Sequence, residues 1–375
     1  PLIVSQDGKR LFTVNTHSNT IAVFDIQPDG SLRHVKGLPF PSHGVAPNSL
    51  SLSGMTLLVS NRNEDYHQIE ALRGAAKASY VSFTVENTGA LRFVSKIDVE
   101  DSQKPTQVYV PQSNPQVGFG NDFQVDVDFD GEGTRSFLAG TKPSVQGQLH
   151  VFQVGRDGRL TERGRMQLPE PNAGYKYKGM DGVPSMPLGI WAHPTESLLY
   201  VGFVTRNELG VYRFTQDGEM TFLRSVENSG QDICWLLTNK KGTRLYTVNN
   251  LPRSDKDDKA ATVSTYDIAG ERAVKPLEIS RLQLPHPGEW FINNRMFSQP
   301  GSTAFQCALS PEETFLYVIC QRINQTDENK SEEGNILHSL RLNGEGIPSV
   351  AHARHLGQDG VHFRSRPQGI ATVNR

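Results

Sequence analysis

Arginine and amide side chains recur along this chain in segments that lack a strand pattern, and together they could hold a small anion. Arginine presents a planar fork of N–H groups that suits carboxylate or phosphate. The candidates for substrate binding are Arg62, Gln124, Arg206, Asn249, Arg295 and Arg322. The alternative for each arginine is a solvated side chain or an ion pair with a nearby carboxylate. Convergence of these side chains on one point would distinguish the two interpretations.

Acid–base chemistry beside these cations would need a histidine or a carboxylate. The loop candidates are His43, Asp122, Asp181, Asp232, Glu289 and His362. Among them, His43 or Asp232 is the predicted catalytic group that moves a proton. His193 belongs to a turn at the opposite end of the repeat described below, so we expect it to be structural.

The sequence indicates no cofactor and no metal site. The run 126–131 has aspartates at alternate positions, but it lacks the later bidentate Glu of a calcium loop. Cys234, Cys307 and Cys320 lack the spacing of metal ligands and are expected to be buried thiols. A disulfide between Cys307 and Cys320 is the alternative if their registers coincide.

Net charge and hydropathy limit the partners. A net charge of −2 provides no general attraction to nucleic acid or to an anionic membrane. No segment approaches the roughly 18 apolar residues of a membrane helix. The expected partner is therefore a small anionic molecule, with the protein a monomer. The location is open between cytoplasmic and secreted, because the N-terminal residues that would decide it are expected to be missing.

The predicted strands and loops that carry these residues form a repeat along the chain. A strand, a short polar turn, two further strands and a Gly turn return about every 50 to 70 residues, which is typical of a radial array of sheets. In the first copy the segments are Leu2–Gly8, Leu11–Asn15, Ile21–Phe24 and Asp29–Leu32. With an outer strand after the Gly turn, each copy supplies the four strands of one propeller blade. Six such copies can be counted.

The predicted fold is an all-β, seven-bladed β-propeller of four-stranded antiparallel blades, formed by residues 1–375 as a single domain. The segment Arg366–Val373 is interpreted as the inner strand of a seventh, incomplete blade, for which roughly 40 residues upstream of Pro1 are expected to be missing by the repeat spacing. A six-bladed ring with a frayed end is the alternative. In either case the long connections, with most candidate residues, open on one face.

The repeated strand-turn-strand pattern resembles that of the lactonase family of seven-bladed propellers, which includes 6-phosphogluconolactonases and carboxymuconate lactonising enzymes. The resemblance is clearest in Leu2–Leu32, Gly189–Met220 and Ala304–Val318, and in the closing Arg366–Ile370. It implies a lactone hydrolase or cycloisomerase, and Arg322 matches a position where the lactonising enzymes carry an arginine. The starts of three inner strands, at 121–124, 186–189 and 231–233, depart from the family in having neither His nor Arg.

Two functions follow as hypotheses. The first is a lactonase-like enzyme that hydrolyses or forms a lactone on a small carboxylated or phosphorylated substrate. The second is a non-catalytic propeller scaffold that binds a ligand or a protein through the same face. A basic cluster together with one titratable group of perturbed pKa would favour the enzyme.

Overall fold

The computed structural model describes most of the chain. The described residues are 1–63, 77–100, 103–125, 128–130, 133–135, 143–169, 185–204, 206–253, 258, 260–285, 291–293, 297–299, 302–322, 334–363, 365 and 367–374. Within these ranges, no helix has the length and hydropathy needed to cross a membrane.

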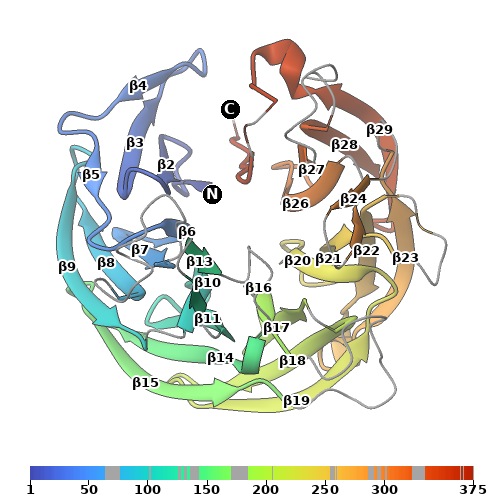
Figure 1. The fold of residues 1–375 in the computed structure, drawn as a ribbon, viewed down its shortest axis with the longest axis horizontal. Coiled ribbons are helices and arrows are strands. Elements are labelled where there is room, and N and C mark those ends of the chain that lie inside the picture. The colour runs from blue at the N-terminus through green and yellow to red at the C-terminus, as the bar shows by residue number, and fades with distance from the viewer. Residues whose placement is uncertain are drawn as a thin grey trace.

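Six antiparallel sheets of four strands stand around a common axis (Figure 1). Blade 1 contains β1 (Leu2–Val4), β2 (Arg10–Asn15), β3 (Thr20–Ile26) and β4 (Leu32–His34), and β5 (Phe40–Pro41) pairs with the loop end of β3. Blade 2 contains β6 (Pro47–Ser53), β7 (Thr56–Asn61), β8 (Ser79–Val85) and β9 (Leu91–Asp98). Blade 3 contains β10 (Gln103–Tyr109), β11 (Val117–Val125), β14 (Pro143–Val154) and β15 (Leu160–Gln167).

The other three blades follow the same order from the axis outward. Blade 4 contains β16 (Pro187–Ala192), β17 (Leu198–Phe203), β18 (Glu208–Phe214) and β19 (Met220–Glu227). Blade 5 contains β20 (Gln231–Thr238), β21 (Arg244–Leu251), β22 (Thr262–Asp267) and β23 (Leu277–Gln283). Blade 6 contains β26 (Ser302–Leu309), β27 (Phe315–Arg322), β28 (Ile336–Leu342) and β29 (Pro348–His355). The repeat seen in the sequence therefore corresponds to one blade per copy.

The prediction of seven blades is wrong, because the described residues form six. The C-terminal segment 367–374 pairs with none of the described strands. It lies instead in the space between blades 1 and 6, with the Thr372 hydroxyl donating to the Leu309 carbonyl at 2.6 Å. Gly369 of this segment lies against Leu2, so the segment passes between β1 and β26. Its strand-like sequence reflects a partly buried segment between two blades and not a place in a sheet.

The hydrophobic core lies between blades. Side chains alternate across each strand, so a sheet can bury both of its faces, and blades 2 to 5 each pack against a blade on either side. Phe12 and Val23 of blade 1 pack with Leu57 and Val81 of blade 2, and comparable clusters join each following pair up to blades 5 and 6. The free, buried Cys234, Cys307 and Cys320 belong to this interior, which confirms the expected thiols.

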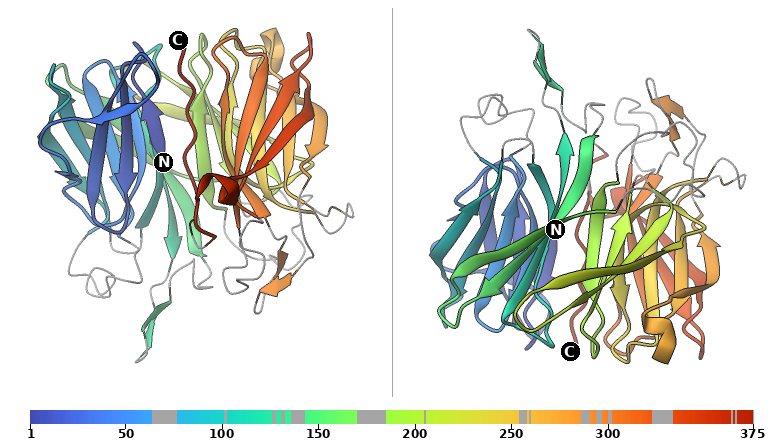
Figure 2. Two further views of the ribbon diagram at one scale, coloured as in Figure 1. Left: turned by 90° about the horizontal axis from the view of Figure 1, so that it is seen from above. Right: turned by 90° about the horizontal axis from the view of Figure 1, so that it is seen from below.

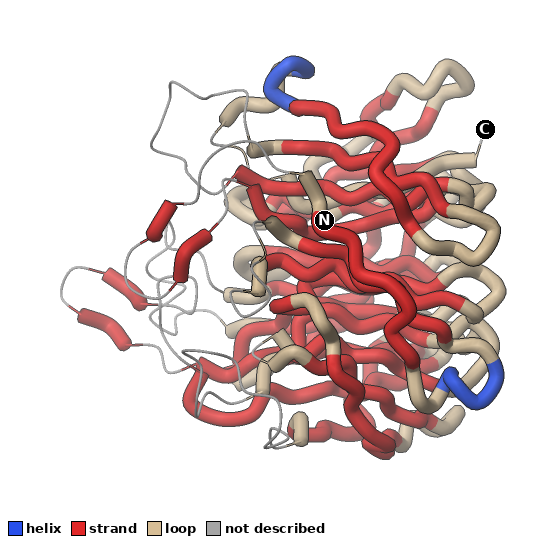
Figure 3. The backbone as a smooth tube through the Cα atoms, turned by 90° about the vertical axis from the view of Figure 1, so that its right-hand side faces the viewer, coloured by secondary structure: helices blue, strands red, loops and turns tan. Residues whose placement is uncertain are grey.

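The ring has two unlike faces. Short hairpins join β1 to β2 and β3 to β4, and their equivalents, at one end, which we call the turn face. The connections β2–β3 and β4–β6, and their equivalents, lie at the other end, the loop face. The hairpins β12 (Asp128–Asp130)–β13 (Gly133–Arg135) and β24 (Phe291–Asn293)–β25 (Phe297–Gln299) project from the loop face (Figures 2 and 3).

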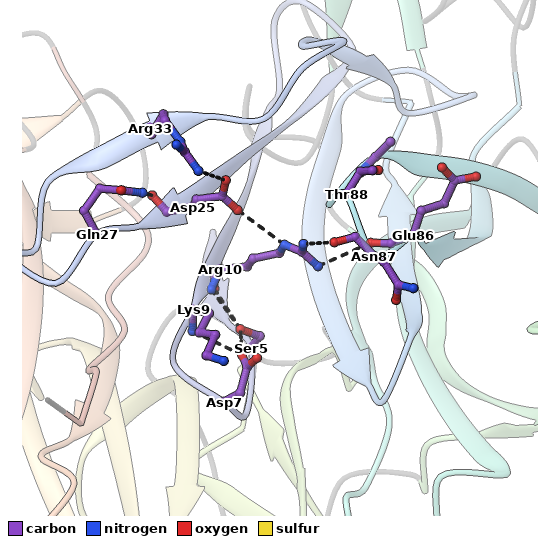
Figure 4. Close-up of polar contacts among 11 residues, drawn as sticks. Ser5, Asp7, Lys9, Arg10, Asp25, Gln27, Arg33, Glu86, Asn87 and Thr88 are labelled. Carbon is purple, nitrogen blue, oxygen red and sulfur yellow. Dashed lines mark hydrogen bonds and ion pairs between the residues drawn. The ribbon is translucent and has the colours of Figure 1, made fainter.

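Arginine side chains join neighbouring blades at the turn face (Figure 4). Arg10, the first residue of β2, lies 3.5 Å from Asp25 of β3 and donates to the carbonyl oxygens of Glu86 and Asn87 in the Gly turn of blade 2. Arg244, the first residue of β21, repeats this pattern with Asp267 at 3.1 Å and the Glu345 carbonyl at 2.6 Å. The repeat thus encodes contacts between blades as well as the strands.

Candidate functional site

A β-bulge shifts the register of the inner strand in blades 2 to 6 near the loop face. The shifts fall between Pro47 and Ser49, Pro105 and Gln107, Pro187 and Ile190, Ile233 and Trp235, and Ala304 and Gln306. Bulges bend a strand and change the direction of nearby side chains, and they recur beside active sites. The residues next to these bulges are therefore candidates for a functional site.

Asp232 lies just before the bulge of β20. It adopts a left-handed backbone conformation, with φ of 60°, which is uncommon for a non-glycine residue inside a strand. The side chain is partly buried, and none of the described residues forms a hydrogen bond or ion pair with its carboxylate. Burial raises the pKa of Asp232 well above its ordinary value. A buried, unpaired carboxyl of this kind is costly for folding and is characteristic of functional sites.

Lys104 occupies the same position on β10 that Asp232 occupies on β20, since each residue immediately precedes the last strand pair before the bulge. The Lys104 side chain is only 2% exposed. The sequence analysis missed this residue. Its signal was a lysine followed by proline at the start of an inner strand.

Arginines gather at the same face. Three arginines follow the second strand of their blade: Arg62 in blade 2, Arg206 in blade 4 and Arg253 in blade 5. Arg322 is the last residue of the second strand of blade 6, so with Lys104 of blade 3 these residues form an arc of cations over five successive blades. Three of these arginines are less than 9% exposed: Arg206, Arg253 and Arg322. A concentration of positive charge at the end of the ring that carries Asp232 favours an anionic ligand there.

Specific contacts hold the guanidinium groups of Arg253 and Arg322, and backbone hydrogen bonds hold the main chain at Arg322 and Arg206. The Arg253 Nη1 atom donates to the Asn228 carbonyl at 3.3 Å and lies 3.7 Å from a Glu227 carboxylate oxygen. The backbone N–H of Arg322 donates to the Asn335 side chain at 2.8 Å, and its guanidinium lies 5.1 Å from the centre of the Phe363 ring. The Arg206 backbone N–H donates to the Phe203 carbonyl at 3.0 Å. Such positioned cations are better suited to orient an anion than solvated ones.

His43 lies apart from this arc. It is exposed, and its ring packs 4.4 Å from the ring of Phe93 on β9, the outer strand of blade 2. Partial burial and the charge of Lys96 lower the pKa of His43. The structure therefore does not bring His43 together with Asp232, which lies on an inner strand of blade 5.

Asn249 is enclosed in a hydrogen-bond network. Its amide nitrogen donates to the hydroxyls of Thr262 and Ser264, both at 3.0 Å, and its oxygen accepts from Asn228 at 2.9 Å. The side chain has no exposed surface. Gly230 lies directly against it, since a Cβ atom there would be 2.0 Å from the Asn249 amide nitrogen. In this position Asn249 holds the connection between blades 4 and 5.

Two of the remaining predicted residues cannot be placed fully. Gln124 lies on β11, where its backbone pairs with Gln103, but its side chain is outside the described part of the structure. Arg295 lies outside the described residues. His193 is structural as expected, because its Nδ1 atom accepts from the Glu196 N–H at 3.0 Å and its Nε2 atom bonds the Gly242 carbonyl at 3.0 Å.

A second polar group lies inside blade 3. His150 of β14 contacts Asp122 through Nε2 and Glu162 through Nδ1, the latter at 2.9 Å, and Arg165 donates to Glu162 at 2.6 Å. Burial alone would lower the pKa of His150, but the two carboxylates outweigh it and raise that pKa. The hydrogen bonds from His150 and Arg165 overcome burial at Glu162 and lower its pKa to about 2. Asp122, one of the loop candidates, is thus committed to an ionic chain within the blade.

Comparison with known proteins supports the fold. Neither the family models nor the curated proteins searched gave a match. A protein of Lactobacillus plantarum has 14% identity and a TM-score of 0.64, with 92% of this chain and 82% of that chain covered. The periplasmic gluconolactonase of Pseudomonas aeruginosa has 15% identity, the same coverage and the same TM-score.

A protein of Bacteroides uniformis with the provisional name 6-phosphogluconolactonase has 13% identity and a TM-score of 0.63, with 93% of this chain and 83% of that chain covered. At such identities the similarity establishes the fold alone. The chain is a β-propeller, with structural neighbours that include proteins named as lactonases.

Proposed function

We propose that this protein is a lactonase-like hydrolase that opens a lactone on a small carboxylated or phosphorylated substrate at the loop face. The observation that carries the proposal is Asp232, a partly buried carboxyl without a partner among the described residues, at the end of the ring where Lys104 and the arginines gather. The lactonase names of several structural neighbours support the same class of reaction.

In this mechanism the Asp232 carboxylate takes a proton from water while the water oxygen attacks the lactone carbonyl carbon. The raised pKa makes this carboxylate a stronger base than an ordinary aspartate. When the ring C–O bond breaks, the protonated Asp232 returns its proton to the departing ring oxygen. The cations hold the anionic group of the substrate and stabilise the negative charge on the carbonyl oxygen.

The test is proton release, followed with a pH indicator, from a panel of lactones that includes a phosphorylated sugar lactone, a carboxylated lactone and a neutral one. We expect turnover of an anionic lactone by the wild type and a loss of at least about 100-fold in Asp232→Asn. Asp217→Asn, in an exposed turn at the other face, is the matched control and should retain full activity.

Absence of turnover with every lactone would reject the hydrolase and favour the scaffold that binds a ligand without chemistry. Full activity of Asp232→Asn would show that another group moves the proton.

A further inference from the structure

The turn-face half of the ring encloses a cavity of about 690 Å³. Its walls come from the inner strands β1, β6, β10, β16, β20 and β26 and from residues 370–374, and the turns at that end form its rim. The volume lies within the range of small-molecule sites in proteins. Asp232, Lys104 and the arginines of the loop face do not line it, so this cavity is separate from the site proposed above.

Aromatic side chains form one wall of the cavity. Tyr109, Trp191 and Trp235 come from three successive inner strands, and the rings of Tyr109 and Trp191 lie 5.0 Å apart at an angle of 35°. Both tryptophans are partly buried, and among the described residues neither indole N–H has a hydrogen-bond partner. The wall therefore combines flat apolar surface with two available donors.

Two glutamines face the same cavity from opposite parts of the ring. Gln107 of β10 and Gln306 of β26 each follow the bulge of their strand, and they are only 2% and 4% exposed. The Gln107 side-chain oxygen accepts from the Ile190 N–H at 2.7 Å. The Gln306 amide forms no hydrogen bond with any described residue. The Gln306 amide is therefore available to donate to and accept from a polar ligand in the cavity.

The charged side chains that line the cavity are confined to its rim, and burial lowers the pKa of the Pro1 amino group, which also lines it, to about 6. The Lys240 ammonium donates to the Pro311 carbonyl at 2.6 Å, and the Glu313 carboxylate accepts from the Lys240 N–H at 2.6 Å. The Asp7 carboxylate accepts from the Ser5 hydroxyl at 2.6 Å (Figure 4). Since these side chains are engaged with the turns and the Pro1 amino group is mostly neutral at pH 7, an ionic ligand would find little counter-charge deeper inside.

We propose that this cavity binds a neutral sugar. The C–H face of a pyranose ring is apolar and packs on aromatic rings, while its hydroxyl groups both donate and accept hydrogen bonds. That combination matches the wall of Tyr109, Trp191 and Trp235 together with the amide of Gln306 and the NH₂ group of Gln107. The inference does not depend on the lactonase activity.

The test is titration of tryptophan fluorescence with neutral mono- and disaccharides, because two of the three tryptophans of the chain line the cavity. Wild-type protein should show a saturable change with at least one neutral sugar, and its phosphorylated or carboxylated counterpart should bind at least about tenfold more weakly. Gln306→Leu keeps the size of the side chain and removes the amide, so it should stay folded and lose at least about tenfold in affinity. Gln153→Leu, at an exposed position of β14, is the control.

Asp232→Asn should leave sugar binding unchanged, which separates this site from the one at the loop face. The proposal is overturned if no neutral sugar gives a saturable change, if Gln306→Leu binds as tightly as the wild type, or if the anionic counterpart binds equally well.

Discussion

The two ends of the ring are built from the same blades but offer different chemistry. At the loop face, five blades contribute buried or partly buried cations, and Asp232 is a carboxyl without a partner among the described residues. At the turn face, the axial cavity presents tryptophan, tyrosine and glutamine, and its rim charges are bound to the turns. The bulges in the inner strands of blades 2 to 6 separate the two environments.

The difference shows how one repeat can support two kinds of recognition. Short turns leave little chain for new groups, so variation at the turn face is limited to inner-strand side chains. Longer connections at the loop face can carry charged residues without disturbing the sheets. Three substitutions and one comparison of pH dependence test this difference between the two faces.

The largest effect is expected at Asp232. Asp232→Asn should lower lactone turnover by about 10²- to 10⁴-fold. The same change should raise the Tm at neutral pH, because a carboxyl whose folded-state pKa is raised destabilises the fold once the pH exceeds its unfolded pKa. Steady-state kinetics and thermal unfolding at pH 7 measure the two effects. A fall in both activity and Tm would indicate a structural role instead.

The connection between blades 4 and 5 should be the most sensitive part of the loop face for folding. Asn249→Ala leaves the Asn228, Thr262 and Ser264 side chains without their shared partner, which should cost about 3 kcal/mol of unfolding free energy. Urea unfolding measures the loss. Asn87→Ala, at an exposed turn position, is the control, and an equal effect of both changes would refute this role of Asn249.

The pH dependence should differ between the two ends. Lactone kcat/KM should fall about tenfold per pH unit below the raised pKa of Asp232, because the base must be ionised. Sugar binding should vary less than about twofold between pH 7 and 8, since the charged side chains that line the cavity lie at its rim and the Pro1 amino group, with its pKa lowered to about 6, is mostly neutral there. Measurements of lactone kcat/KM and of sugar affinity over the same pH range check both expectations. A shared pH profile would mean that the two sites act as one.

The smallest effect is expected for the contacts between blades at the turn face. Arg244→Lys keeps the charge but loses the planar fork that reaches both Asp267 and the Glu345 carbonyl, so we expect a loss of about 1 kcal/mol. Arg213→Lys on the exposed face of β18 provides the comparison and should have almost no effect in the same unfolding experiment.

The blades could be predicted well from the sequence because each strand-turn-strand pattern is formed by residues close together in the chain. All six copies of the pattern form sheets of four strands, and the Gly turns lie at the positions that the pattern predicted. The seventh blade was wrong for a physical reason, because a partly apolar segment such as 367–374 can lie partly buried between two blades without pairing with a described strand. Side-chain alternation cannot tell these two states apart.

The candidate site was less predictable, because it depends on register. Asp232 was selected from the sequence, whereas Lys104 and Gln306 were missed, since their place beside a bulge appears only when both strands are paired. Asn249 was selected for its amide, but that amide is enclosed by neighbours from other segments of the chain. Such contacts are not visible in the order of residues along one strand.

The acceptors of Arg10 and Arg244 have a consequence for how this protein can change over evolutionary time. In both cases the neighbouring blade contributes main-chain carbonyl oxygens, from Glu86 and Asn87 or from Glu345. A carbonyl is the same whatever side chain stands beside it, so these turns can drift in sequence while the join between blades persists. The arginine and its aspartate must be kept in one blade, and the next blade needs to keep only the shape of its turn.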